Sequence, residues 1–261
     1  MSVQSIDRAL QIIDILSGHS EGLNMMAITK TIHLPKSTTH RLLQSLISNG
    51  YVEQDEKTGK YSLSTKILQI STKVLKKYDF VKISKPYMEK ISNFTGETVH
   101  LCVRNHDEAI YIDKVEGRHT IRMYSQIGKR VKLYCTAVGK ILLSELPDKE
   151  IEDLYRGKLF NPYTENTIKT IDQLLDRIQD SRRRSFAFDN EEHEKGILCV
   201  AAPIFNHENK IIAALSLSGP IERMSKGIDQ NNFINILLKT CADISKSLGC
   251  TLAWDMEVSE E

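Results

Sequence analysis

Polar and basic side chains are concentrated between residues 36 and 44, where their types and spacing suit contacts with DNA. A helix over residues 36–49 would place them opposite a buried stripe made of Thr39, Leu42, Leu43, Leu46 and Ile47. Arginine can donate two hydrogen bonds to guanine, whereas serine, threonine and lysine also bind phosphate oxygens. An ordinary exposed polar side chain is the alternative for each residue alone, so the prediction rests on the set. We expect the DNA contacts of this helix to come from Lys36, Ser37, Thr38, His40, Arg41 and Gln44.

The distribution of charge supports the same interpretation, because basic residues are concentrated near one end of the chain. Residues 30–77 hold nine lysines and arginines and three acids, a net charge of +6 in a chain whose total is +1. A local basic segment favours the phosphate backbone of a nucleic acid as a partner. A solvated basic surface without a partner is the alternative.

A second group of residues, in the C-terminal half, suits the binding of a small acid. In segment 135–140 a strand or loop leads into a helix, and the free amides of Ala137 and Val138 at that helix start would favour a carboxylate. Ser216 and Ser218 alternate along a predicted strand, so both hydroxyls face the same side of the sheet. Serines whose hydroxyls are satisfied within the sheet are the alternative to a binding role.

The elements that carry the first group follow the order of a winged helix-turn-helix. Hydrophobic periodicity and breaking residues predict three helices and then a hairpin, at 5–17, 25–32, 36–49, 51–54 and 60–63. The first helix is expected to bury a stripe made of Ile6, Ala9, Leu10, Ile13 and Leu16.

Two further features complete this N-terminal region. Lys57 and Lys60 stand at the tip of the hairpin, where they would reach the DNA backbone or the minor groove. Segment 64–78 is helical and half polar, which predicts a linker helix that packs against its copy in a dimer. A surface helix of the following domain is the alternative for this segment.

The rest of the chain mixes helices and strands, which predicts an α+β domain with a largely antiparallel sheet. Expected helices are 81–94, 137–145, 149–154, 171–184 and 229–248. Expected strands are 98–104, 109–115, 120–124, 197–205 and 210–218. The domain organisation is therefore expected to be 1–64 for DNA binding, 65–79 for the linker helix and 80–261 for ligand sensing.

Composition limits the class of protein. The chain has 261 residues, is 41% hydrophobic and 26% charged, and holds no uninterrupted apolar run of about 18 residues that would span a membrane. The N-terminus is an amphipathic helix rather than a signal peptide, so we expect a cytoplasmic protein. Scattered cysteines argue against a disulfide framework or a zinc ribbon; they are Cys102, Cys135, Cys199, Cys241 and Cys250.

Several motifs in a fixed order make the sequence similar to a known family. They are LPKSTTHRLLQSLISNGYVEQD (34–55), KYSLS (60–64), TGETVHLCV (95–103), YCTAVGKILL (134–143), FAFDNEEHEKGILCVAAPI (186–204) and AALSLSGP (213–220). Across nearly its whole length the chain resembles the IclR family of transcription regulators. Ser64, Ser71 and Ser185 depart from glycines that are usual in the family, which affects the expected bending of the linker and the turn before Phe186.

The resemblance implies a winged helix-turn-helix, a linker helix and a GAF-like effector domain, in dimers or dimers of dimers that bind palindromic DNA. Such regulators are usually repressors, sometimes activators, and respond to small organic acids from carbon catabolism. It also implies that the amides of Ala137 and Val138 bind a carboxylate. The other ligand-binding positions that it implies are polar Asp189, Cys199, Ser216 and Ser218, with Met123 and Val131 as apolar lining.

Other classes of function have less support. An enzyme would place a catalyst at Cys135, Asp189 or His193, yet no nucleophile elbow, Walker loop or dinucleotide fingerprint is present. A metal sensor would use the HEKGI segment, but Ile197 stands where a zinc motif needs its second histidine, and a solvated acidic turn is the preferred interpretation. We expect no catalytic residue, no metal and no cofactor. A purely architectural DNA binder would not need the large C-terminal domain.

Overall fold

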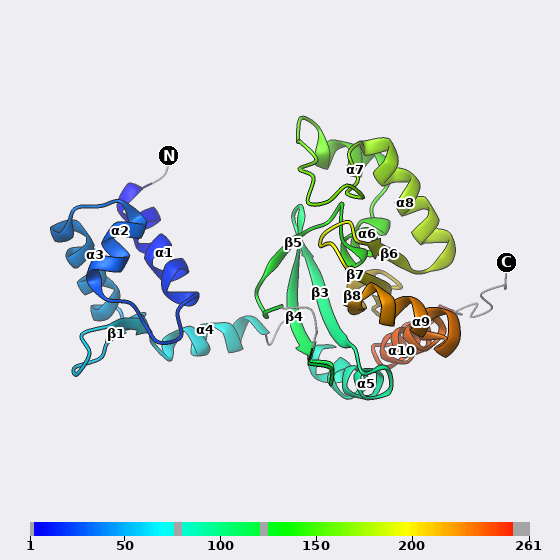
Figure 1. Cartoon of the computed structure of the whole chain (residues 1–261), viewed down its shortest axis with the longest axis horizontal. Helices are drawn as coiled ribbons and strands as arrows, with labels where there is room; N and C mark the ends of the chain where they lie inside the picture. The colour runs from blue at the N-terminus through cyan, green and yellow to red at the C-terminus, as the bar shows by residue number, and fades with distance from the viewer. Residues whose placement is uncertain (1–2, 76–79, 121–124, 253–261) are drawn as a thin grey trace. The chain divides into compact units, whose positions relative to one another are not determined.

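The computed structural model describes residues 3–75, 80–120 and 125–252, and the chain divides into two compact units, 1–79 and 80–261 (Figure 1). The first unit has the expected winged helix-turn-helix order. Its helices are α1 (Gln4–Ser17), α2 (Met25–Ile32), α3 (Lys36–Ser48) and α4 (Lys66–Leu75). The two strands of the wing, β1 (Val52–Gln54) and β2 (Tyr61–Leu63), pair antiparallel.

Local chemistry sets the turn between α2 and α3. The Asn24 side chain caps α2 by accepting a hydrogen bond from the Ala27 amide at 2.9 Å. The helix ends at His33, which adopts a left-handed conformation with φ 51°. Pro35 then starts α3, because its fixed φ is compatible with a helix start and its missing N–H is not needed there. The turn therefore directs α3 away from α2 within three residues.

The buried face of α1 differs from the predicted stripe. Ile6 and Leu10 are 56% and 54% exposed, whereas Ile12 and Leu16 are almost fully buried against α2, α3 and the wing. The periodicity correctly predicts a helix, but apolar residues occur on more than one face of α1. Contact with the neighbouring helices selects the side that carries Ile12, so the prediction for Ile6 and Leu10 is wrong.

The second unit is built on one six-stranded antiparallel sheet with the order β5-β4-β3-β8-β7-β6. Its strands are β3 (Thr98–Asn105), β4 (Glu108–Val115), β5 (Arg130–Lys132), β6 (Ala187–Asn190), β7 (Ile197–Phe205) and β8 (Ile211–Pro220). Its helices are α5 (Phe80–Thr95), α6 (Ala137–Ser144), α7 (Asp148–Tyr155), α8 (Ile171–Arg184), α9 (Ile221–Asn231) and α10 (Phe233–Ser247). Figure 1 shows α5, α9 and α10 on one side of this sheet and α6, α7 and α8 on the other. The expected α+β class with an antiparallel sheet is confirmed.

Three details of this unit depart from the predicted elements. The edge strands β5 and β6 were not predicted, because three or four residues are too few to show a clear alternation. The single helix predicted over 229–248 is divided at Asn232, whose φ of 55° ends α9 before α10 begins. Most of the strand predicted at 120–124 lies outside the described residues. Within the part of the chain that is described, no helix is long and apolar enough to span a membrane.

Helix α6 is the most enclosed element of the second unit. Every residue from Ala137 to Leu143 is buried, including Lys140 at 2% exposure. Because a buried ammonium group needs partners, it is significant that Lys140 Nζ donates to the Phe188 carbonyl at 2.6 Å and forms an ion pair with Glu192. Lys140 therefore joins α6 to β6 and to the turn that follows it.

Gly139 allows α6 to pack this closely. A Cβ placed there would lie 2.2 Å from the Leu133 carbonyl oxygen, which is backbone and cannot move aside as a side chain can. We expect Gly139→Ala to destabilise the protein by about 2 kcal/mol or more, because overpacking a dense core displaces backbone. Urea unfolding followed by circular dichroism measures this change. The control is Gly18→Ala, at a position with φ −84° and only ordinary contacts; an equal loss in both variants would contradict the packing argument.

Candidate functional site

The surface of α3 places the predicted polar residues together on one face. Lys36, Ser37, His40, Arg41 and Gln44 are exposed and Thr38 is half-buried, while the opposite side buries Thr39, Leu43 and Leu46. No hydrogen bond or ion pair with another described residue occupies the side chains of Lys36, His40, Arg41 or Gln44. Their donors and acceptors are therefore available to base edges or phosphates.

The start of α3 adds backbone donors to this surface. No side chain caps the helix, since Pro35 occupies the cap position. The amides of the first turn thus keep the partial positive charge of a helix N-terminus, which attracts phosphate oxygens. Side chains suited to bases and amides suited to phosphates would thus come from the same helix.

The wing presents its lysines on an ordered tip. Asp55 Oδ1 accepts the Lys57 amide at 3.1 Å and the Thr58 amide at 2.7 Å, and Gly59 adopts a φ of 67°. The hydrogen bonds from Thr58 lower the pKa of the Asp55 carboxyl, so the turn keeps its charge and shape at neutral pH. Lys57 is exposed and Lys60 half-buried, both next to a turn whose geometry is locally determined.

In the second unit, the first turn of α6 leaves two amides available. Thr136 caps the helix, because its hydroxyl accepts the Gly139 amide at 3.2 Å and its carbonyl accepts the Lys140 amide at 3.1 Å. The amides of Ala137 and Val138 precede these capped positions, at the positive end of the helix dipole. This arrangement suits a carboxylate, as the sequence predicts.

A small cavity lies in front of these amides. It has a volume of about 10 Å³ and is lined by Tyr111, Thr136, Ala137, Val138, Asp189, His193, Cys199, Ser216 and Ser218. Asp189 lies opposite Cys199 in the β6–β7 register, and Cys199 lies opposite Ser218 in the β7–β8 register. Six of the eight predicted ligand-binding residues therefore line one cavity. Its room is that of a single water molecule, so a ligand would have to expand it.

The two predicted apolar residues have different positions. Val131 is buried on β5, opposite Ala109, and belongs to the core without lining the cavity. Met123 lies outside the described residues.

Asp189 is a buried carboxyl group of the cavity with a raised pKa. It is 3% exposed, and burial raises the pKa of its carboxyl to about 7, although Lys140 and two hydrogen bonds oppose the shift. Those bonds come from the amides of Glu192 at 2.8 Å and His193 at 3.2 Å, both to Oδ1. Asp189 can thus act as acceptor or, when protonated, as donor to a ligand oxygen.

Two histidines that sequence reasoning did not assign to the cavity contribute to it. His193 lines it, with Nδ1 3.8 Å from the Cys135 sulfur and its ring 5.0 Å from that of Tyr163. His100 lies behind Ser218, with Nδ1 3.4 Å from the serine hydroxyl. Burial lowers the pKa of His100 to about 3 and also lowers that of His193, so both rings are neutral at pH 7. A histidine in a predicted strand or acidic turn carries no sequence signal for this role.

The acidic segment around His193 is not the solvated turn that was predicted. Glu192 is only 8% exposed, because its carboxylate pairs with Lys140 and its carbonyl accepts the Thr167 hydroxyl at 2.6 Å. A sequence pattern of adjacent acids cannot show that one of them faces a buried lysine 52 residues away. Among the described residues, no group of three or more histidine, cysteine, aspartate or glutamate side chains is arranged to hold a metal ion.

The thiols near the cavity are poor nucleophiles. Burial raises the pKa of both Cys135 and Cys199 well above the usual range of a cysteine. A thiol, rather than a thiolate, is therefore present at neutral pH. These residues act as small, weakly polar lining.

Comparison with known proteins places both units in the same group. Residues 5–56 match the family model described as the IclR helix-turn-helix domain. Residues 72–246 match the model for the C-terminal region of the bacterial transcriptional regulator IclR. The two matches cover both the α3 surface and the cavity.

Individual relatives share nearly the full length. The chain is 35% identical over 247 residues to the HTH-type transcriptional regulator XynR of Escherichia coli, covering 95% of this chain and 98% of that protein. It is 30% identical to the transcriptional repressor IclR of the same species, covering 85% and 82%. The crystal structure of the Thermotoga maritima IclR superposes with a TM-score of 0.77 at 31% identity, covering 94% and 99%.

The raised pKa of Asp189 predicts a particular dependence of stability on pH. Because its pKa rises from about 3.9 in the unfolded chain to about 7 on folding, the folded state is favoured by protonation, and this stabilisation is lost as pH rises towards 7. Asp189→Asn keeps the acceptor oxygen and removes the charge. Its advantage in unfolding free energy over the wild type should grow by about 1–3 kcal/mol between about pH 5 and about pH 8. Urea titrations at both pH values test this, with exposed Asp172→Asn as control; a constant difference would show that Asp189 does not titrate this way.

Proposed function

Because this chain belongs to the IclR family and is thus a DNA-binding transcription regulator, we propose that it represses a carbon-catabolism operon under the control of a small organic acid. The observation that carries the proposal is the small polar cavity at the start of α6, where two helix amides, two serines and a buried aspartate converge. Activation of transcription by the same architecture is the alternative.

On the DNA side, the exposed face of α3 is proposed as the recognition surface. Arg41 is suited to a bidentate contact with guanine, and Ser37 and Thr38 with the first-turn amides are suited to phosphate. Lys57 and Lys60 would hold the adjacent backbone or minor groove. A dimer would place two such helices in successive major grooves about 34 Å apart, on a palindromic operator.

On the ligand side, the amides of Ala137 and Val138 would bind the effector carboxylate. The hydroxyls of Ser216 and Ser218 and the carboxyl of Asp189 would bind its remaining oxygens, with Cys199 as lining. Because the cavity holds only about 10 Å³, the acid would bind a more open arrangement than the one described. An effector changes DNA binding only through such a difference in affinity between two arrangements.

The remaining parts of the proposal concern organisation. Residues 1–64 are assigned to DNA binding, 65–79 to a linker helix and 80–261 to effector sensing, in a cytoplasmic dimer or tetramer. We propose a regulator without catalytic activity of its own, because burial keeps the cavity thiols protonated at neutral pH.

Arg41→Ala tests the recognition surface. Loss of one bidentate base contact should weaken operator binding by about 5- to 150-fold while binding to random duplex changes little. Fluorescence anisotropy with the upstream DNA of the protein's own gene and with a scrambled duplex measures both affinities. Arg156→Ala is the matched control, at an exposed arginine directly after α7. An unchanged preference for the operator in Arg41→Ala would remove α3 from base recognition.

Ala137→Val tests the cavity. Two added methyl groups in a space of about 10 Å³ should block the effector and leave operator affinity unchanged. The response is measured as the change in operator affinity on adding keto acids, sugar acids or aromatic acids, with Ala242→Val on α10 as control. If Ala137→Val responds like the wild type, the effector binds elsewhere.

A further inference from the structure

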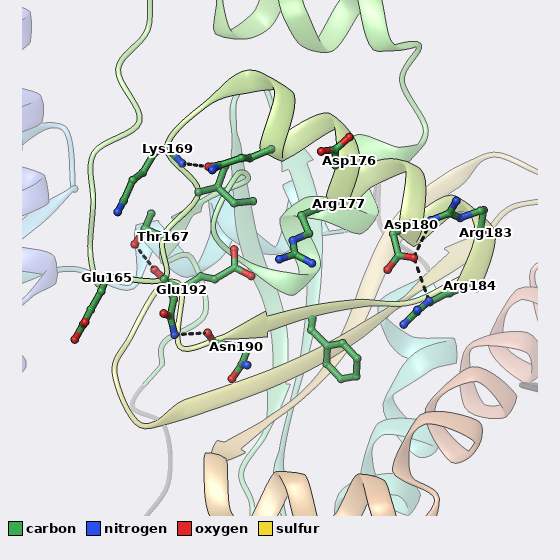
Figure 2. A pocket seen from close by; sticks show the side chains of 14 residues that line it. Glu165, Thr167, Lys169, Asp176, Arg177, Asp180, Arg183, Arg184, Asn190 and Glu192 are labelled. Atoms are coloured by element: carbon green, nitrogen blue, oxygen red, sulfur yellow. Dashed lines mark hydrogen bonds and ion pairs between the residues drawn. The ribbon is translucent and has the colours of Figure 1, made fainter. Parts of the chain in front are cut away.

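A second and much larger hollow lies on the other side of β6, between that edge strand and α8. Two adjoining cavities of about 850 and 430 Å³ share the residues Arg177, Asp180, Phe188, Asn190 and Glu192. We call the pair the β6–α8 groove, and Figure 2 shows the residues that line its larger cavity. It shares no lining residue with the small cavity at the start of α6, because neighbouring residues of a strand face opposite sides.

One buried acceptor in the groove has no partner. Glu192 Oε1 pairs with Lys140, but Oε2 is buried and accepts no hydrogen bond from any described residue. The residue is 8% exposed and lines both cavities. Leaving a buried carboxylate oxygen unsatisfied costs free energy, so a donor from outside the chain would be favoured there.

A positively charged hydrogen-bond donor faces this carboxylate. Figure 2 shows Arg177 extending from α8 into the groove toward Glu192, which extends from the other wall. Within the described part of the chain, the Arg177 guanidinium has no ion-pair partner. A ligand between them would receive hydrogen bonds from Arg177 and donate one to Glu192.

The other charges of the groove largely cancel. Asp180 pairs with both Arg183 and Arg184, at 3.2 and 3.1 Å. Lys140 is neutralised by Glu192. The groove therefore has no strong excess of one sign, and a multiply charged anion or cation would meet groups of both signs. An uncharged molecule that both donates and accepts hydrogen bonds fits better.

Part of the groove lining is apolar and aromatic. Phe186, Phe188, Leu198, Ile221 and Ile228 line the cavity of about 430 Å³, together with the polar groups. Such a lining matches a sugar ring. The amide, carboxylate and guanidinium groups can exchange hydrogen bonds with the sugar hydroxyls, which both donate and accept, and the aromatic and aliphatic carbon can contact its apolar C–H faces. The volume of the groove accommodates one or two such rings.

We propose that the β6–α8 groove is a binding site for a neutral mono- or disaccharide, separate from the cavity assigned to the acid effector. Glu192 Oε2 accepts a hydrogen bond from a sugar hydroxyl, and the Arg177 guanidinium donates to a sugar oxygen. The aromatic part of the lining contacts the ring. The site depends on the β6–α8 groove alone and not on the assignment of the acid cavity.

The experiment is saturation-transfer NMR on the full-length protein, titrated with D-glucose, D-xylose and maltose. Thermal shift is unsuitable, because sugars stabilise folded proteins by exclusion from their surface. Saturable binding of at least one sugar is expected, with a dissociation constant in the millimolar range or tighter. Arg177→Gln should weaken it by about five-fold or more, because hydrogen bonds to a charged group are strong. Glu192→Gln should also weaken it, because an amide nitrogen in place of Oε2 donates where the carboxylate accepts; circular dichroism checks that this variant folds, since Lys140 loses its counter-charge.

Two controls separate the groove from other sites. Arg156→Gln, with the same charge change directly after α7, should bind the sugar like the wild type. Ala137→Val should also retain it. The proposal is overturned if no sugar saturates up to about 50 mM, if Arg177→Gln binds as well as the wild type, or if Ala137→Val loses the signal. The last result would place the sugar in the acid cavity instead.

Discussion

The buried pair of Lys140 and Glu192 is the interaction on which the sensing unit depends. Lys140 lies within a helix whose other residues are in the core, and it holds both the Phe188 carbonyl and the Glu192 carboxylate. A buried ion pair adds little net stability compared with apolar packing, but removing one partner leaves a costly unpaired charge. Its contribution is therefore to position the chain: it joins the start of α6, which offers the amides, to the segment that carries Asp189.

That segment forms a wall with two different sides. On one side Asp189 faces the small cavity, held by the amides of Glu192 and His193. On the other side Glu192 faces the β6–α8 groove, and its carbonyl is held by Thr167. The two surfaces are therefore built from neighbouring residues of one short segment. Burial makes the ionised form of Asp189 costly, and the cavity has little room. Both features would favour a rearrangement of the cavity when a ligand supplies hydrogen-bond partners.

The first unit differs from the second in where its polar side chains lie. Its core is small, and its proposed recognition surface is the exposed face of α3, where Lys36, His40, Arg41 and Gln44 have no side-chain partners among the described residues. Exposed flexible side chains contribute little to folding and can be selected for the bases that they contact. The sensing unit instead holds its polar groups in the core, where each one must be satisfied by the fold or by a ligand. The two kinds of site thus place opposite demands on packing.

The sequence alone was sufficient for features encoded by local periodicity and local motifs. The helix-turn-helix, the wing, the α+β class, the α3 polar face and the amides before Gly139 all depend on residues within one or two turns of each other. Tertiary structure decided the features that need distant partners. Ile6 and Leu10 are exposed because neighbouring helices contact the side of Ile12, and Glu192 is buried because Lys140 lies opposite. The cavity positions of His193 and Tyr111 and the entire groove depend on which strands and helices meet in space, which no single stretch of sequence encodes.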